Sequence, residues 1–109
     1  MSDKQELALR YNEGKPQLSY ISSAPEALKG LARVFEYGAK KYARDNWKKG
    51  LPITKLIDSF ERHKLEFANG IDIDEESGLP HADLMLWNAL VISEMYHTRK
   101  DMDDRTAPL

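Results

Sequence analysis

The segment from Leu84 to Tyr96 is apolar at most of its positions and leaves this 109-residue chain few choices of fold. Read as a helix, it carries apolar side chains on every side, which is typical of a helix at the centre of a bundle or in an interface. Pro80, a residue favoured in first turns, places the helix start nearby. The segment is shorter than the roughly 20 apolar residues of a membrane span, so it predicts a central helix.

A first helix is predicted over about residues 24–44. Ser23 followed by Glu26 forms a capping box, and apolar residues recur at helical spacing after it. The preceding segment contains Gly14-Lys15-Pro16, which predicts a loop.

A second helix is predicted from Ile53 to about residue 68, where Asn69-Gly70 provides the usual left-handed ending. No strand pattern lasts beyond a few residues, so the sequence predicts an all-α fold, a small bundle of about three to four helices. We expect one domain over residues 1–109, with a charged, frayed tail from about residue 100.

A bundle of this size removes only about two-thirds of its unfolded surface from water. We therefore expect the bundle to be completed by homo-oligomerisation, as a dimer or a tetramer.

The composition argues against several classes of function. The absence of cysteine excludes disulfides, zinc–thiolate sites and thiol nucleophiles. The formal net charge of −2, without a basic block, argues against a nucleic-acid partner. The N-terminus has no apolar leader and no segment is long enough to span a membrane, so we expect a cytoplasmic protein without a membrane partner.

Three polar residues stand on or beside apolar helix faces. His81 and Asn88 share one stripe of the central helix, and His63 lies at the edge of the apolar face of the preceding helix. A buried polar group without a partner costs about 1–3 kcal/mol, so each must be paired or face a cavity. The simplest interpretation is structural: His81 caps its helix, Asn88 bonds a neighbouring backbone group, and His63 is a satisfied core residue.

The loop between these helices is acidic, with carboxylates at Asp72, Asp74, Glu75 and Glu76. Clustered carboxylates bind hard divalent cations such as Mg²⁺ and Mn²⁺, although a solvated surface loop would look the same. A calcium-binding helix–loop–helix is disfavoured, because Ser77 stands where the sharp-turn glycine belongs.

Basic and aromatic residues that could serve a nucleotide lie elsewhere in the chain. Lys15 and Lys41 could meet the charge of a triphosphate beside a bound metal, although each alone is an ordinary solvated charge. Tyr42 and Trp47 could stack on a base, although each is also an ordinary packing residue. No glycine-rich phosphate loop is present.

Five stretches together resemble the small phage and prophage proteins named dATP/dGTP diphosphohydrolases, relatives of the MazG-like all-α nucleoside triphosphate pyrophosphohydrolases. The most specific is the block Asp-x-Glu-Ser-Gly-x-x-His. The stretches are "RYNEGKP" at 10–16, "YGAKKYARDNW" at 37–47, "RH" at 62–63, "DEESGLPH" at 74–81 and "WNAL" at 87–90.

The resemblance implies a helical, metal-dependent enzyme that cleaves a nucleoside triphosphate to the monophosphate and pyrophosphate. If the protein is phage-encoded, it would act in the cytoplasm of a bacterial host. This chain departs from the wider superfamily in one respect, because Arg62-His63 stands where two carboxylates are expected.

The same resemblance assigns roles to single residues. It implies that the ligands of Mg²⁺ or Mn²⁺ come from His63, Asp74, Glu76 and His81, with Asp74, Glu76 and His81 preferred and with Glu66 and Asp83 as possible substitutes. Glu76 or His63 would accept the proton of the attacking water. The predicted substrate contacts are Lys15, Lys41, Asn46, Trp47, Arg62 and Asn88.

Two other classes of protein remain open at this point. A helical interaction module would show no response to metal. A nucleotide-binding regulator without activity would be stabilised by Mn²⁺ plus nucleotide and would not turn it over.

Overall fold

The computed structural model describes residues 6–106, and every regular element in that range is helical apart from a single bridge between Ile73 and Pro80. The all-α prediction is confirmed. None of the helices in this range has the length and apolar character needed to cross a bilayer. In chain order the elements are α1 (Ser19–Ser22), α2 (Pro25–Lys41), the 3-10 turn η1 (Asn46–Lys49), α3 (Ile53–Ala68), α4 (His81–Thr98) and the 3-10 turn η2 (Lys100–Met102).

The three long helices lie where the sequence predicts them. α3 has the predicted bounds and is followed by Gly70 in the left-handed region, at φ 84°. α2 ends at Lys41 instead of about residue 44, and the short helix α1 falls in a segment predicted to be a loop. The boundaries differ because end residues are fixed by caps and turns, which periodicity does not report.

The predicted capping box at the start of α2 is wrong. The cap position is Ala24, and the hydroxyl of Ser23 donates to the carbonyl oxygen of Tyr20 at 2.6 Å. Glu26 pairs instead with Lys29, one turn further on, at 3.3 Å. The Ser23 hydroxyl is therefore bonded to α1 and does not cap α2.

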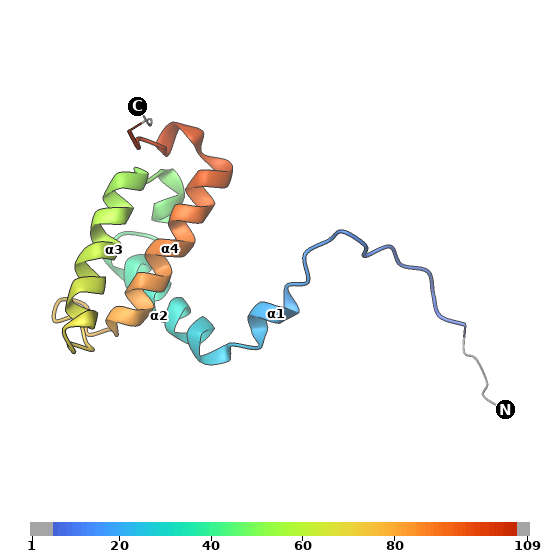
Figure 1. Cartoon of the computed structure of the whole chain (residues 1–109), viewed down its shortest axis with the longest axis horizontal. Helices are drawn as coiled ribbons and strands as arrows, with labels where there is room; N and C mark the ends of the chain where they lie inside the picture. Colours follow the sequence, from blue (N-terminus) through green and yellow to red (C-terminus); the bar gives the residue numbers. More distant parts are fainter. Residues whose placement is uncertain (1–5, 107–109) are drawn as a thin grey trace.

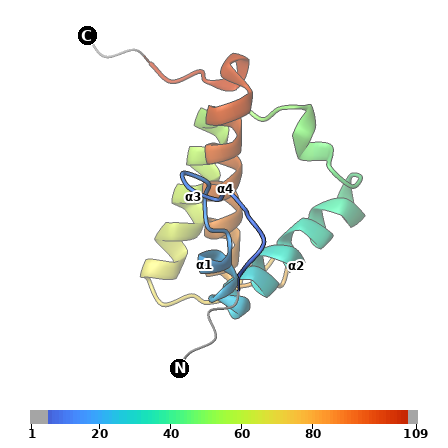
Figure 2. The same ribbon diagram turned by 90° about the vertical axis from the view of Figure 1, so that its right-hand side faces the viewer.

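The helix α4 is central, as predicted. It runs antiparallel to α3 along its length and contacts α2 on another side (Figures 1 and 2). The core between α3 and α4 consists of Ile53, Leu56, Val91 and Met95, each at most 4% exposed. Both helices present apolar residues to this seam at helical spacing, so burial of these side chains fixes their relative position.

α2 contacts α4 along the stretch from Gly30 to Phe35, whose ring packs edge-on against Trp87. There Gly30 lies against the carboxylate of Asp83, and a β-carbon at Gly30 would collide with that group. Towards Lys41, α2 diverges from the α3–α4 pair, and the chain returns through η1 to the start of α3 (Figure 2). This divergence opens a space between α2, η1 and α4.

The chain after α4 is held against the body as far as Asp104, although we expected it to fray from about residue 100. Met102 packs against the core, and the Asp104 carboxylate accepts hydrogen bonds from the Thr54 backbone N–H at 2.9 Å and hydroxyl at 2.6 Å. Asp104 therefore caps α3, whose own cap position is occupied by Pro52. Residues 107–109 of the predicted tail lie outside the described range.

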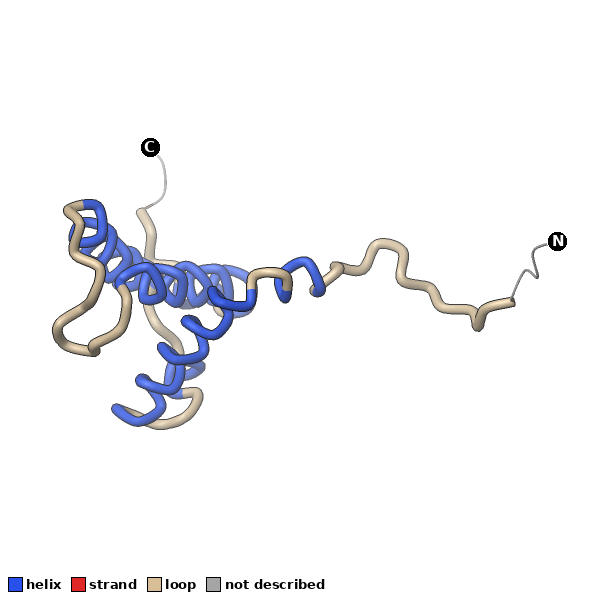
Figure 3. Tube along the Cα trace, turned by 90° about the horizontal axis from the view of Figure 1, so that it is seen from below, coloured by secondary structure: helices blue, strands red, loops and turns tan. Residues whose placement is uncertain are grey.

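The N-terminal segment extends away from the helices as an arm (Figures 1 and 3). The radius of gyration is 18.9 Å, whereas a compact chain of this length has about 13 Å. Apolar side chains on the arm, including Leu7, Leu9 and Tyr11, are about four-fifths exposed. Homo-oligomerisation, which would cover such residues, stays a prediction.

Candidate metal centre

Three side chains from separate elements converge at the end of the bundle where α3 stops and α4 starts. His63 comes from α3, Asp74 from the connecting loop, and His81 is the first residue of α4. One potential ligand atom of each lies within 4.8 Å of the other two. The two imidazole Nδ1 atoms are 2.8 Å apart. Two imidazoles and one carboxylate form a donor set that suits a divalent transition metal.

Backbone hydrogen bonds hold the loop that carries Asp74. The backbone N–H of His81 donates to the Asp72 carbonyl at 2.8 Å, and the N–H of Asp74 donates to the Leu79 carbonyl at 2.9 Å. The turn closes with the N–H of Gly78 on the Asp74 carbonyl at 2.8 Å, and Gly78 has φ 73°, which a glycine adopts without strain. The loop is therefore a fixed turn that places Asp74 beside the two imidazoles.

The carboxylate of Asp74 is oriented and kept ionised. Its Oδ2 accepts hydrogen bonds from the Ser77 hydroxyl at 2.6 Å and backbone N–H at 2.9 Å. Burial acts to raise the pKa of Asp74, but these bonds, together with His63 and His81, outweigh it and hold that pKa below its usual value. The oxygen Oδ1 has no hydrogen bond among the described residues, so this carboxylate can still bind a cation.

His81 is almost completely buried, at 1% exposed, and carries a carboxylate on its far side. Its Nε2 lies 3.1 Å from Glu66 Oε2, at an angle outside that of a hydrogen bond. A carboxylate at this position favours the tautomer with the proton on Nε2 and leaves the Nδ1 lone pair for a ligand. His81 does more than cap its helix, because its ring contacts residues of α3.

His63 is half-buried, and burial is the main cause that lowers its pKa. His81 and Arg62 lower the pKa further, whereas Asp74 and Glu66 act to raise it. A lowered pKa keeps this imidazole neutral near pH 7, and the neutral ring is the form that binds metals.

Glu76, predicted as a ligand and a base, lies outside the three-residue cluster. Its carboxylate accepts a hydrogen bond from Lys41 Nζ at 3.1 Å, which links the loop to the end of α2. The hydrogen bond and the charge of Glu76 raise the pKa of Lys41. An open hollow of about 590 Å³ adjoins the cluster on this side, and its wall is formed by Glu66, Ile71, Asp74, Glu75 and Glu76.

The other predicted substrate residues lie in several places. Lys15 is exposed on the N-terminal arm, and Arg62 is exposed on α3 next to His63. Asn88 is buried and donates to the Leu84 carbonyl at 2.9 Å and to the Ser59 hydroxyl at 3.2 Å. It therefore bonds a neighbouring backbone group, as the structural interpretation of the sequence predicts.

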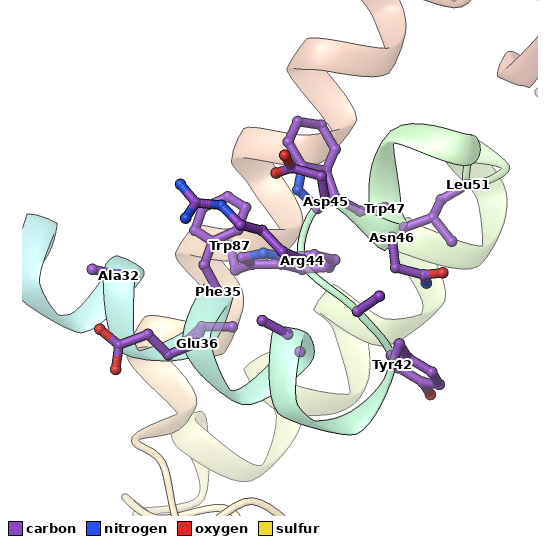
Figure 4. Close-up of a pocket in the computed structure, with 14 residues that line it drawn as sticks. Ala32, Phe35, Glu36, Tyr42, Arg44, Asp45, Asn46, Trp47, Leu51 and Trp87 are labelled. Carbon is purple, nitrogen blue, oxygen red and sulfur yellow. The ribbon is translucent and has the colours of Figure 1, made fainter.

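Asn46 and Trp47 line a separate cavity of about 500 Å³ between α2, η1 and α4 (Figure 4). Sequence reasoning did not single out two aromatic residues in its wall, Phe35 and Trp87. Both were read as core positions, because a helical apolar position looks the same whether it packs against a neighbour or lines a cavity.

A protein-family model described as "dATP/dGTP diphosphohydrolase, N-terminal" matches residues 5–105. A curated relative, the dATP/dGTP diphosphohydrolase of Salmonella phage PMBT28, is 37% identical over 97 residues, which are 89% of this chain and 32% of the relative. The chain thus spans about a third of the length of the curated relative it matches. No solved structure matches the chain.

Proposed function

This chain belongs to the dATP/dGTP diphosphohydrolase family, and on that premise we propose that it hydrolyses a deoxypurine nucleoside triphosphate, such as dGTP or dATP, to the monophosphate and pyrophosphate. The observation that carries the proposal is the convergence of His63, Asp74 and His81 beside a hollow walled by carboxylates. Such a site suits a metal-bound polyphosphate, because the metal offsets the repulsion between the carboxylates and the phosphates.

The proposed metal is Mn²⁺ or Mg²⁺, held by His63, Asp74 and His81. Of the four ligand candidates expected from the sequence, these three lie together, whereas Glu76 lies outside the cluster and pairs with Lys41. The donor atoms favour Mn²⁺ over Mg²⁺, since imidazole is a poor partner for Mg²⁺. Glu66, placed behind His81, would orient that ring.

The bound metal would lower the pKa of a water molecule and polarise a phosphoryl oxygen. The chain's own residues supply the remaining steps. Lys41 would leave Glu76 for the triphosphate, and the negative charge of the phosphates would then keep it cationic. Glu76, then free, would accept the proton of the attacking water. Lys41 and the exposed Arg62 would neutralise the charge that develops on the leaving pyrophosphate.

The test is incubation with each deoxynucleoside triphosphate and Mn²⁺ or Mg²⁺, followed by separation of pyrophosphate from orthophosphate. We expect pyrophosphate and the monophosphate from dGTP or dATP. His81→Ala should lower the rate by more than about 100-fold, since loss of a residue behind a ligand already costs 10–100-fold.

His97→Ala is the matched control. His97 is the remaining histidine of the chain, on the same helix, exposed and outside the cluster, so its removal should leave the rate unchanged. Orthophosphate as the product, or equal rates for the two variants, would contradict the proposal. Thermal stabilisation by Mn²⁺ plus dGTP without turnover would instead indicate a nucleotide-binding regulator.

A further inference from the structure

The cavity between α2, η1 and α4 lies apart from the metal centre and has no role in the proposal above. Its volume of about 500 Å³ falls in the range of small-molecule sites. The cavity is open to solvent on one side, so a small molecule can enter it from solution.

The walls of the cavity are aromatic. The ring centroids of Phe35 and Trp47 are 5.9 Å apart, and those of Phe35 and Trp87 are 6.0 Å apart, with the planes tilted by 58° and 66°. These side chains surround the opening seen in Figure 4. Aromatic faces of this kind bind nucleobases by stacking.

One wall lacks side-chain bulk, and one edge is polar. Gly38 belongs to the α2 wall, and a β-carbon there would meet no atom within 4 Å. Asp45 has a positive φ of 61°, which L-residues rarely adopt, and this bend precedes Asn46 at the polar edge. The Asn46 amide can both donate and accept hydrogen bonds, as the edge of a base requires.

The cavity meets the metal loop at the end of α2. Tyr42 lines the cavity, and its neighbour Lys41 bonds Glu76, two residues after Asp74. A ligand with a base in the cavity and phosphates at the metal centre would therefore pass Lys41, whose charge could meet its phosphates.

We propose that this cavity binds the purine base of the nucleotide, with Phe35, Trp47 and Trp87 as its stacking walls and Asn46 at the base edge. This inference rests on the proposed function for the identity of the ligand. The cavity itself can be tested without any hydrolysis.

The first experiment follows the indole N–H signals of the unmodified protein by NMR, without metal. The chain has two tryptophans, and both line the cavity, so both signals report on it. Deoxyguanosine at millimolar concentration should shift both signals, and deoxycytidine should shift them less. Unmoved signals would overturn the inference even if the protein hydrolyses dGTP. Shifts in a protein that hydrolyses no triphosphate would support the cavity and refute the proposed function.

The second experiment fills the cavity. Gly38→Leu places a side chain in open space, and Ala27→Leu, at an exposed position of the same helix, is the matched control. With Mn²⁺, Gly38→Leu should weaken binding of a dGTP analogue with an α,β-methylene bridge by about tenfold to a hundredfold. Inorganic tripolyphosphate, which has no base, should bind both variants equally. Equal loss for both ligands, or no loss, would overturn the inference.

A second copy of the chain is the alternative occupant, because the N-terminal arm exposes apolar side chains. If dilution of the protein alone moves the indole signals, the cavity is filled by another copy and the inference fails. Signals that stay constant on dilution support a free cavity.

Discussion

The two sides of α4 differ in how completely they are packed. Towards α3, the seam is continuous, with Val91 and Met95 at 0% and 1% exposed, and the imidazoles of His63 and His81 meet at its end. Towards α2, the contacts reach from Gly30 to Phe35, and the end of the helix then diverges beside a cavity. The tightly packed side fixes ligand atoms to within a few ångströms, whereas the open side leaves room for a molecule.

The largest expected effect is the difference in unfolding free energy between two leucine-to-alanine variants. Leu56 is 4% exposed in the seam, and Leu51 is half-buried beside the cavity. Leu56→Ala should lower the free energy of unfolding by about 3 kcal/mol, because it leaves a hole in packed surroundings. Leu51→Ala should cost about 1 kcal/mol, because the space that it leaves joins one already open. Urea unfolding measures both, and equal losses would show that the two sides are packed alike.

The next effect compares two glycines of the same helix. Gly30→Ala places a methyl group against the Asp83 carboxylate, the end of a flexible side chain that must move away, so the lost contact should offset most of the gain in helix propensity of about 1 kcal/mol. Gly38→Ala meets no atom, so it should stabilise the protein by about 0.5–1 kcal/mol. Thermal unfolding of both variants measures the difference, and a larger stabilisation by Gly30→Ala than by Gly38→Ala would contradict the close contact between Gly30 and Asp83.

The smallest effect concerns pH in the absence of metal. Burial holds the pKa of His63 below its unfolded value of 6.5, so the unfolded chain binds more protons in this range. Stability due to His63 is therefore fully present above pH 6.5 and is lost as the pH falls through the folded pKa. His63→Gln should flatten the pH dependence of the unfolding midpoint over this window. An unchanged slope in the variant would assign the effect to other groups.

Much of this architecture could be predicted from the sequence, and the reasons differ between elements. The bounds of α3 and the central place of α4 follow from apolar periodicity, which depends only on near neighbours in the chain. His63 and His81 could be named because polar residues on or beside apolar faces are conspicuous. Asp74 belongs to the acidic loop, and the family resemblance made all three ligand candidates, which the structure brings together.

The pairing of Glu76 with Lys41 could not be predicted, because the two residues are 35 positions apart and meet only where the end of α2 approaches the loop. The cavity was missed for a related reason. Phe35 and Trp87 belong to helices with apolar faces, and only the divergence of α2 decides that their rings border a space.

The contact between Asp104 and Thr54 has a consequence for how the protein forms during synthesis. The helix that carries His63 is capped by a residue 50 positions further along the chain. As the chain leaves the ribosome, α3 and the two imidazoles emerge before their cap. The start of α3 therefore lacks this cap until Asp104 has been synthesised, and we expect the metal centre to reach its full stability only after that point.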